Sequence, residues 1–83
     1  MAAAQLSDAG RDVDRSIDVR FLEPPEPFER IVTALDELPG GETLRVMIHR
    51  EPHPLYRYLR RERYNFRAGY NPGGFFEIFI TRE

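Results

Sequence analysis

Two proline-rich segments, residues 20–27 and 49–54, contain most of the side chains that could support binding chemistry. Each segment follows an apolar run and precedes a run with helical spacing, so each is expected to open a helix. Backbone amides at a helix start, with arginines beside them, suit an anion or the carboxylate of a partner. The candidate binding residues are Arg20, Glu23, Pro24, Pro25, His49, Arg50, Glu51 and His53. The alternative is structural: the two arginines pair with the glutamates and hold the two turns together.

A metal site at these segments is only weakly indicated. His49 and His53 are four residues apart, which on a helix would place both on one face, but Pro52 lies between them. Zinc would also need carboxylate ligands. The nearby candidates are Asp18, Glu23 and Glu51. We therefore predict no metal and no cofactor, with His53 as a turn residue and His49 as a half-exposed strand residue.

Nucleophilic catalysis has little support in this chain. There is no cysteine, so the sequence offers neither a thiolate nor a disulfide. Its serines, Ser7 and Ser16, stand beside no histidine in a recognisable catalytic arrangement. Glycine-rich phosphate loops of the nucleotide-binding types are absent as well. The sequence therefore predicts a protein that is not an enzyme.

Basic and aromatic residues interleave at Arg57, Arg60, Arg61, Arg63 and Arg67 and at Tyr56, Tyr58 and Tyr64. Such a mixture can bind single-stranded nucleic acid through phosphate contacts and stacking. Against this, the 83-residue chain has a net charge of −2, and Tyr58 and Tyr64 are expected in the core. Nucleic acid is therefore the third of three functional hypotheses.

The spacing of apolar residues predicts six elements. Strand alternation covers 17–21, 43–49, 64–70 and 75–81, and helical spacing covers 26–38 and 54–62. Prolines suit the first turn of a helix, where amide hydrogens have no intrahelical partner. Asn71-Pro72-Gly73-Gly74 predicts a hairpin between the last two strands. The inward-facing residues of the last strand are expected to be Phe76, Ile78 and Ile80.

The resulting order is β-α-β-α-β-β, and its strand-helix-strand units favour parallel, right-handed connections. Two helices are enough to cover only one face of a four-stranded mixed sheet. We therefore predict an α+β fold, a two-layer α/β sandwich with both helices on one face and the other face open. Both helices then start at the same edge of the sheet, which brings the two proline-rich segments together.

The open sheet face is expected to present Met47, Phe75 and Phe79. Strand residues of one parity share a face, and contiguous apolar side chains there indicate a contact surface. We predict a protein partner or self-association through this face. The alternative is ordinary exposure of scattered apolar side chains.

Residues 1–15 lack apolar periodicity and are expected to form a flexible tail before a single domain over 16–83. No apolar run approaches the roughly 20 residues of a membrane span. The first fifteen residues also lack a secretory signal pattern. We therefore expect a cytoplasmic protein without membrane association.

Leu22-Glu23-Pro24-Pro25-Glu26-Pro27 and Leu38-Pro39-Gly40-Gly41-Glu42-Thr43-Leu44 resemble the TusA/SirA-like sulfur-carrier proteins. Those proteins open their first helix with Cys-Pro-x-Pro; here Pro25-Glu26-Pro27 matches, and Pro24 takes the place of the cysteine. The chain more closely resembles domain-of-unknown-function family 2249, a branch that lacks the cysteine. The matching stretches are Asp18-Val19-Arg20, the proline-rich joint, Arg50-Glu51-Pro52-His53-Pro54-Leu55-Tyr56 and Ile80-Thr81-Arg82. The resemblance implies a TusA-like fold without thiol sulfur transfer.

These features predict a non-catalytic cytoplasmic binding or adaptor module with a TusA-like fold. The alternative is an accessory protein of sulfur or redox metabolism. Such a protein would bind an anionic ligand or a metal at the edge where the helices start.

Overall fold

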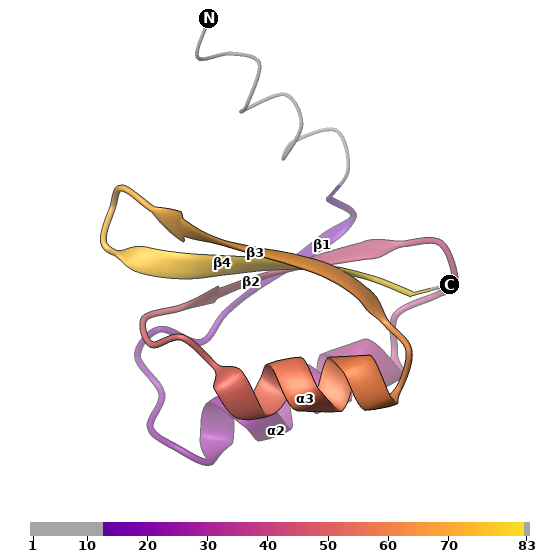
Figure 1. The fold of residues 1–83 in the computed structure, drawn as a ribbon, viewed down its shortest axis with the longest axis horizontal. Coiled ribbons are helices and arrows are strands. Elements are labelled where there is room, and N and C mark those ends of the chain that lie inside the picture. The colour runs from indigo at the N-terminus through magenta and orange to yellow at the C-terminus, as the bar shows by residue number, and fades with distance from the viewer. Residues whose placement is uncertain (1–12, 83) are drawn as a thin grey trace, which may run out of the picture.

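The structure is a computed structural model that describes residues 13–82. It contains β1 (Arg15–Asp18), α2 (Glu26–Asp36), β2 (Thr43–Ile48), α3 (His53–Arg61), β3 (Asn65–Asn71) and β4 (Phe75–Thr81). The four strands form one sheet in the order β1-β2-β4-β3. Both helices lie on one face of this sheet, and no described element covers the other face (Figure 1). The predicted α+β sandwich and its element order are confirmed.

The register explains why several turns meet at one edge. β1 runs parallel to β2, with Ile17 opposite Val46, whereas β4 is antiparallel to both of its neighbours. β1 and β2 therefore end at the same edge, and each leads into a helix. Phe76 of β4 pairs with Ile48, the last residue of β2, so the β3–β4 turn lies at this edge too. Figure 1 shows the starts of both helices and this turn at one end of the molecule.

The core fills the space between the sheet and the helices. The inward set predicted for the last strand is confirmed, because Ile78 and Ile80 are fully buried and Phe76 packs against them. Alternate residues of β2 and one face of each helix supply Leu44, Val46, Ile48, Ile31, Leu35, Leu55, Tyr56 and Leu59. Burial of each such aliphatic side chain contributes about 1.5–3 kcal/mol, which offsets the entropy lost on folding.

The first strand differs from its predicted range of 17–21. β1 ends at Asp18 because the carboxylate of Asp18 accepts a hydrogen bond from the backbone N–H of Arg20 (3.1 Å), as in an Asx turn. Val19 enters the core, and Phe21 is left 85% exposed instead of facing inward. At its other end β1 begins at Arg15, the last residue of the predicted tail. Residues 1–12 of that tail lie outside the described residues.

The other elements agree with their predicted ranges to within about two residues, the usual uncertainty of element ends. Two residues after the end of α3, Arg63 has a φ of 64°, a left-handed conformation that glycine normally adopts. The N–H of Tyr64 donates to the carbonyl of Leu59 (2.9 Å), and that of Arg63 donates to Arg60 (3.1 Å). This is the Schellman pattern of helix termination, and it turns the chain directly into β3.

Candidate functional site

A groove of about 940 Å³ lies at the edge where both helices start. We call it the helix-start groove. Its walls are the β1–α2 turn, the β2–α3 turn and the β3–β4 turn. The apolar part of its lining includes Phe21, Leu22, Pro24, Phe28, Pro54 and Phe75. The charged part consists of Arg20, Glu23, Arg50 and Glu51. The structure thus brings the residues predicted from the two proline-rich segments to one site, except His53, which does not line the groove.

The β1–α2 turn forms the first wall. Pro25 precedes the first residue of α2, and Pro27 lies in its first turn. Proline fits there because it presets a helical φ and lacks the N–H that a first turn leaves unpaired. Pro27 is buried, but Phe28 beside it is 36% exposed and Phe21 is far more so. Two aromatic rings therefore remain at least partly uncovered in this wall.

The β2–α3 turn and the β3–β4 turn complete the groove. Pro52 and Pro54 repeat at α3 the arrangement seen at α2. Gly73, Gly74 and Phe75 close the third side. Gly74 has a φ of 97°, which a residue with a side chain adopts only with strain. Sequence reasoning missed this third wall because its position depends on the pairing of β4 with β2, and Phe21 was missed because it was assigned to a strand.

Few backbone amides are free at the two helix starts. At α2 the N–H of Glu26 donates to the carbonyl of Glu23 (2.9 Å), and Pro27 has no N–H. At α3 the N–H of His53 likewise donates a hydrogen bond to a backbone carbonyl (3.1 Å), and Pro54 has no N–H. One further first-turn amide in each helix has no hydrogen bond among residues 13–82. The helix starts thus offer an anion fewer donors than the sequence suggests.

Arg20 is bound to its own strand rather than to the opposite turn. Its Nε and Nη2 donate to the two carboxylate oxygens of Asp18 at 2.9 and 2.8 Å. These hydrogen bonds, with that from the backbone N–H of Arg20, lower the pKa of Asp18 from 3.8 to about 2. The guanidinium also lies over the ring of Phe75 (4.6 Å) and near that of Phe21 (5.5 Å). Arg20 therefore marks the border between the groove and the open sheet face.

Glu51 is engaged within its own segment. It accepts a hydrogen bond from the hydroxyl of Tyr56 (3.2 Å), and its other oxygen lies 3.6 Å from Nε2 of His53. Burial raises the pKa of Tyr56 to about 12, and the negative charge of Glu51 adds to this effect. Tyr56 therefore stays a neutral donor at neutral pH. Within residues 13–82, His49 and His53 join no third histidine or acidic side chain in a group that could hold a metal ion.

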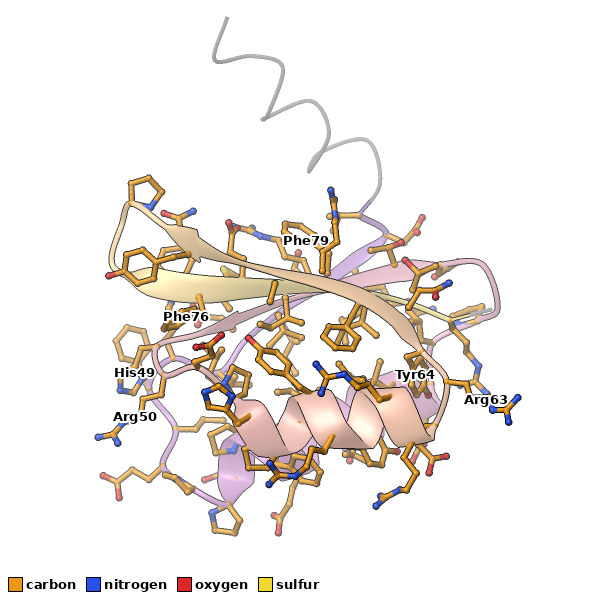
Figure 2. The ribbon with its side chains drawn as sticks, in the orientation of Figure 1. His49, Arg50, Arg63, Tyr64, Phe76 and Phe79 are labelled. Atoms are coloured by element: carbon orange, nitrogen blue, oxygen red, sulfur yellow. The ribbon has the colours of Figure 1, made fainter. Side chains whose placement is uncertain are left out.

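Glu23 and Arg50 make no ion pair with any described residue. Figure 2 shows Arg50 just beyond the end of β2, pointing away from the protein. The cross-pairing that would hold the two turns together does not occur among residues 13–82. The formal charges of the two arginines and two glutamates in the lining cancel. The groove is therefore mainly apolar, with a rim that carries no net charge.

The open sheet face carries Met47, Phe75 and Phe79 on one parity of β2 and β4. All three are half-buried, and Glu77 lies between the two phenylalanines and forms an ion pair with Arg45. This ion pair crosses from β2 to β4 and interrupts the apolar surface. The structure thus places these three residues on one face without joining them into one apolar patch.

The rings of this face are also covered from the side. The guanidinium of Arg67 lies 5.4 Å from the ring centre of Phe79, as that of Arg20 lies over Phe75. Figure 2 shows Phe79 on the side of the sheet away from the helices, and Phe76 on the helix side. The exposed large apolar residues of the described chain are Phe21, Phe28 and Tyr70. None of them belongs to the predicted interaction face.

The tyrosines that interleave with arginine face inward. Tyr56 is buried, and Tyr58 and Tyr64 pack against the core, as expected for the latter two. Burial is the main cause of a raised pKa at Tyr58. The neighbouring arginines remain exposed at the surface of α3 and β3. The predicted nucleic-acid surface therefore keeps its charge and lacks these three tyrosines as free stacking partners.

The fold and the groove define a small α+β domain with a large, mainly apolar groove at its helix starts. Residues 16–82 match the model of the family described as "Uncharacterized conserved protein (DUF2249)". The chain belongs to this family. No curated protein and no solved structure gives a significant match to the sequence. Among residues 13–82, no helix is both long enough and apolar enough to cross a membrane.

Proposed function

We propose that this protein is a non-catalytic binding module whose helix-start groove holds a short apolar segment of another protein. The observation that carries the proposal is the apolar groove itself, with the ring of Phe21 almost fully exposed at its side. Binding sites are typically concave and mostly apolar, with a few polar groups that fix orientation. Covering one phenylalanine contributes about 2 kcal/mol to association. A segment that fills the groove would gain this energy at more than one ring.

Arg50 supports a further feature of the occupant. Its side chain is exposed, has no ion-pair partner among residues 13–82, and lies at the rim of the groove, where it points outward. A carboxylate on the bound segment would pair with it. The other charged residues of the lining do not favour a ligand with a net negative charge. The prolines also remove backbone N–H donors from the two helix starts. These features make a small inorganic anion a poorer occupant than an apolar group that carries one carboxylate.

The proposal keeps the cytoplasmic adaptor role expected from the sequence and sets aside sulfur transfer. Pro24 stands where TusA-like carriers hold cysteine, and the chain has no thiol on which a persulfide could form. The proline-rich turn is then a rigid wall for a partner. An anion-binding accessory protein of sulfur or redox metabolism is the competing hypothesis.

Chemical-shift mapping of the isotope-labelled protein tests this choice with three probes. N-acetyl-phenylalaninamide supplies an apolar ring, N-acetyl-phenylalanine adds a carboxylate, and inorganic phosphate is an anion without a ring. We expect saturable shifts confined to residues 19–28, 48–55 and 73–75 with both ring probes, and tighter binding of the carboxylate. Phosphate should give none. Saturation by phosphate alone would favour the anion hypothesis, and no saturable shift with any probe would remove the site.

The contribution of Arg50 is separable by a matched pair of variants. Arg50→Gln should remove the advantage of N-acetyl-phenylalanine over its amide, because the amide lacks the charge that Arg50 would bind. Arg61→Gln is the control, because Arg61 is also an exposed arginine and lies outside the groove. An unchanged preference in Arg50→Gln would show that the carboxylate is bound elsewhere.

A further inference from the structure

β3 is an edge strand whose outer side has no partner strand among residues 13–82. Its seven residues pair one-to-one with β4, from Asn65 opposite Thr81 to Asn71 opposite Phe75. In such a ladder every second residue turns its N–H and C=O away from the neighbouring strand. Proteins commonly block edges of this kind with proline, lysine, a bulge or a covering segment. β3 contains no proline, no lysine and no bulge.

Four exposed arginines belong to β3, to α3 beneath it and to the turn between them. Arg57 and Arg60 are three residues apart on α3 and so share one of its flanks, and α3 lies beneath β3 (Figure 1). Arg63 precedes the strand, and Arg67 projects from it on the face away from the helices, where it lies over Phe79. None of the four forms an ion pair with a described residue. In a chain of net charge −2, this edge is a local concentration of positive charge.

β3 offers one largely open aromatic ring, that of Tyr70, which is 63% exposed; its other ring is already in contact with other groups. Phe66 is stacked on Tyr56 of α3 (5.5 Å) and has the guanidinium of Arg60 5.6 Å from its ring centre. Single-stranded nucleic acid needs open ring faces on which its bases stack. A polypeptide needs only the free backbone groups and the charge. The observations therefore favour a peptide over a nucleic acid.

We propose that β3 accepts an extended acidic segment of another protein as a fifth strand of the sheet. Backbone hydrogen bonds to alternate residues of β3 would hold the segment, as in other cases of strand addition. Its carboxylates would meet Arg57 and Arg60 on one side and Arg67 on the other. A second copy of this chain fits less well, because pairing β3 with β3 would bring the arginine flanks of two α3 helices together. The surface is separate from the helix-start groove, and the proposal is independent of the groove.

An NMR titration of the full chain with the peptide Thr-Glu-Glu-Val-Glu-Glu-Thr tests the proposal. We expect saturable shifts at residues 57–71 and slower hydrogen exchange at alternate amides of β3. The double change Arg57→Gln and Arg60→Gln should weaken binding about fivefold, because two exposed ion pairs of about 0.5 kcal/mol each sum to about 1 kcal/mol. Arg30→Gln on α2 is the matched control and should leave binding unchanged, because Arg30 is an exposed helical arginine distant in sequence from this edge.

Two further ligands make the outcome decisive. A peptide with lysine in place of each glutamate should not bind, and an N-methylated acidic peptide should bind without slowing exchange in β3, or not at all. Equal binding of the lysine peptide would overturn the charge argument. Equal exchange protection by the N-methylated peptide would overturn strand addition. Binding of oligo-deoxythymidine at the same arginines, or no saturable shift with the acidic peptide, would also overturn the proposal.

Discussion

The helix-start groove and the open sheet face both carry phenylalanine side chains outside the core, yet they differ in what they expose. In the groove, Phe21 is 85% exposed. On the sheet, Phe75, which also borders the groove, and Phe79 are half-buried. A guanidinium lies near all three rings, at 5.5 Å from Phe21, 4.6 Å from Phe75 and 5.4 Å from Phe79, so the regions differ in burial by the surrounding strands. The difference shows that an aromatic side chain outside the core is available for binding only where its neighbours do not already cover it.

Backbone geometry explains this difference. On a sheet, residues of adjacent strands lie about 5 Å apart on the same face, so a long side chain readily reaches a neighbouring ring. Arg67 is directly opposite Phe79 in the β3–β4 register. A turn has no such row of neighbours. After the Asx turn at Asp18 the chain leaves the sheet, and Phe21 loses the cross-strand partners that would have covered it.

The largest expected effect is on stability, where one phenylalanine of each region is removed. Phe79→Ala should lower the free energy of unfolding by about 2 kcal/mol. Replacing a fully buried phenylalanine by alanine costs about 3–5 kcal/mol, and Phe79 is half-buried. Phe21→Ala should change it by less than about 0.5 kcal/mol, as for exposed positions generally. Urea denaturation measures both values. Equal destabilisation by the two changes would remove the distinction between the regions.

A second change breaks the ion pair that divides the open face. Glu77 accepts hydrogen bonds from Arg45 (2.8 Å from Nε) and from Asn71 (3.1 Å). Glu77→Gln should lower the free energy of unfolding by about 1–2 kcal/mol, since hydrogen bonds to charged groups contribute more than neutral ones. The control is Glu26→Gln, whose exposed pair with Arg30 spans 3.8 Å and should contribute little. A larger loss at Glu26 would contradict the argument.

A third change lies outside both the groove and the open sheet face, and its effect on stability can be compared with the first two. Arg63→Gly should raise the free energy of unfolding by about 0.5–1 kcal/mol, because glycine adopts the left-handed conformation at the end of α3 without steric cost. Arg57→Gly, in the middle of the same helix, is the opposing control and should destabilise. A loss of stability in Arg63→Gly would show that the Arg63 side chain makes a compensating contact.

The smallest expected effect is a change in the pH dependence of stability at the border of the two regions. The pKa of Asp18 is lowered to about 2 in the folded protein by its bonds to Arg20, from 3.8. The unfolded chain therefore binds more protons in this range, so the contribution of Asp18 is present above about pH 4 and is lost as the pH falls toward 2.

Denaturation at a series of pH values measures this slope, which is how steeply the free energy of unfolding falls as the pH is lowered from about 4 toward 2. Arg20→Gln should make it shallower, because it removes the hydrogen bonds that hold the folded pKa low. Arg50→Gln, an arginine without an ion pair among residues 13–82, should leave it unchanged. The same slope in wild type and Arg20→Gln would contradict the role given to the Asp18–Arg20 pair.

Much of the fold could be predicted because it depends on local periodicity. Ile78 and Ile80 repeat every second residue, and the apolar residues of α2 repeat at helical spacing, so their faces follow from the sequence alone. The convergence of the two proline-rich segments followed from the parallel connection of β1 and β2. The same alternation of strand residues predicted that Phe79 lies on the open face. It does not predict that an arginine lies opposite Phe79.

The parts that could not be predicted depend on single contacts or on strand order. One hydrogen bond from the N–H of Arg20 to Asp18 ends β1 and exposes Phe21. The third wall of the groove, at Gly73 and Gly74, follows only from the position of β4 beside β2. The predicted salt bridges between the two turns require distances that the sequence does not contain, and the structure pairs Arg20 with Asp18 instead.

The affinity of N-acetyl-phenylalanine for Phe21→Ala and for Phe79→Ala tests the central claim most directly. If the helix-start groove is the binding surface, Phe21→Ala should weaken the probe about tenfold, which corresponds to about 1.4 kcal/mol and to the loss of most of one ring contact. Phe79→Ala, once shown to be folded, should bind the probe as the wild type does. Weaker binding in Phe79→Ala, with unchanged binding in Phe21→Ala, would contradict the account and assign binding to the open sheet face.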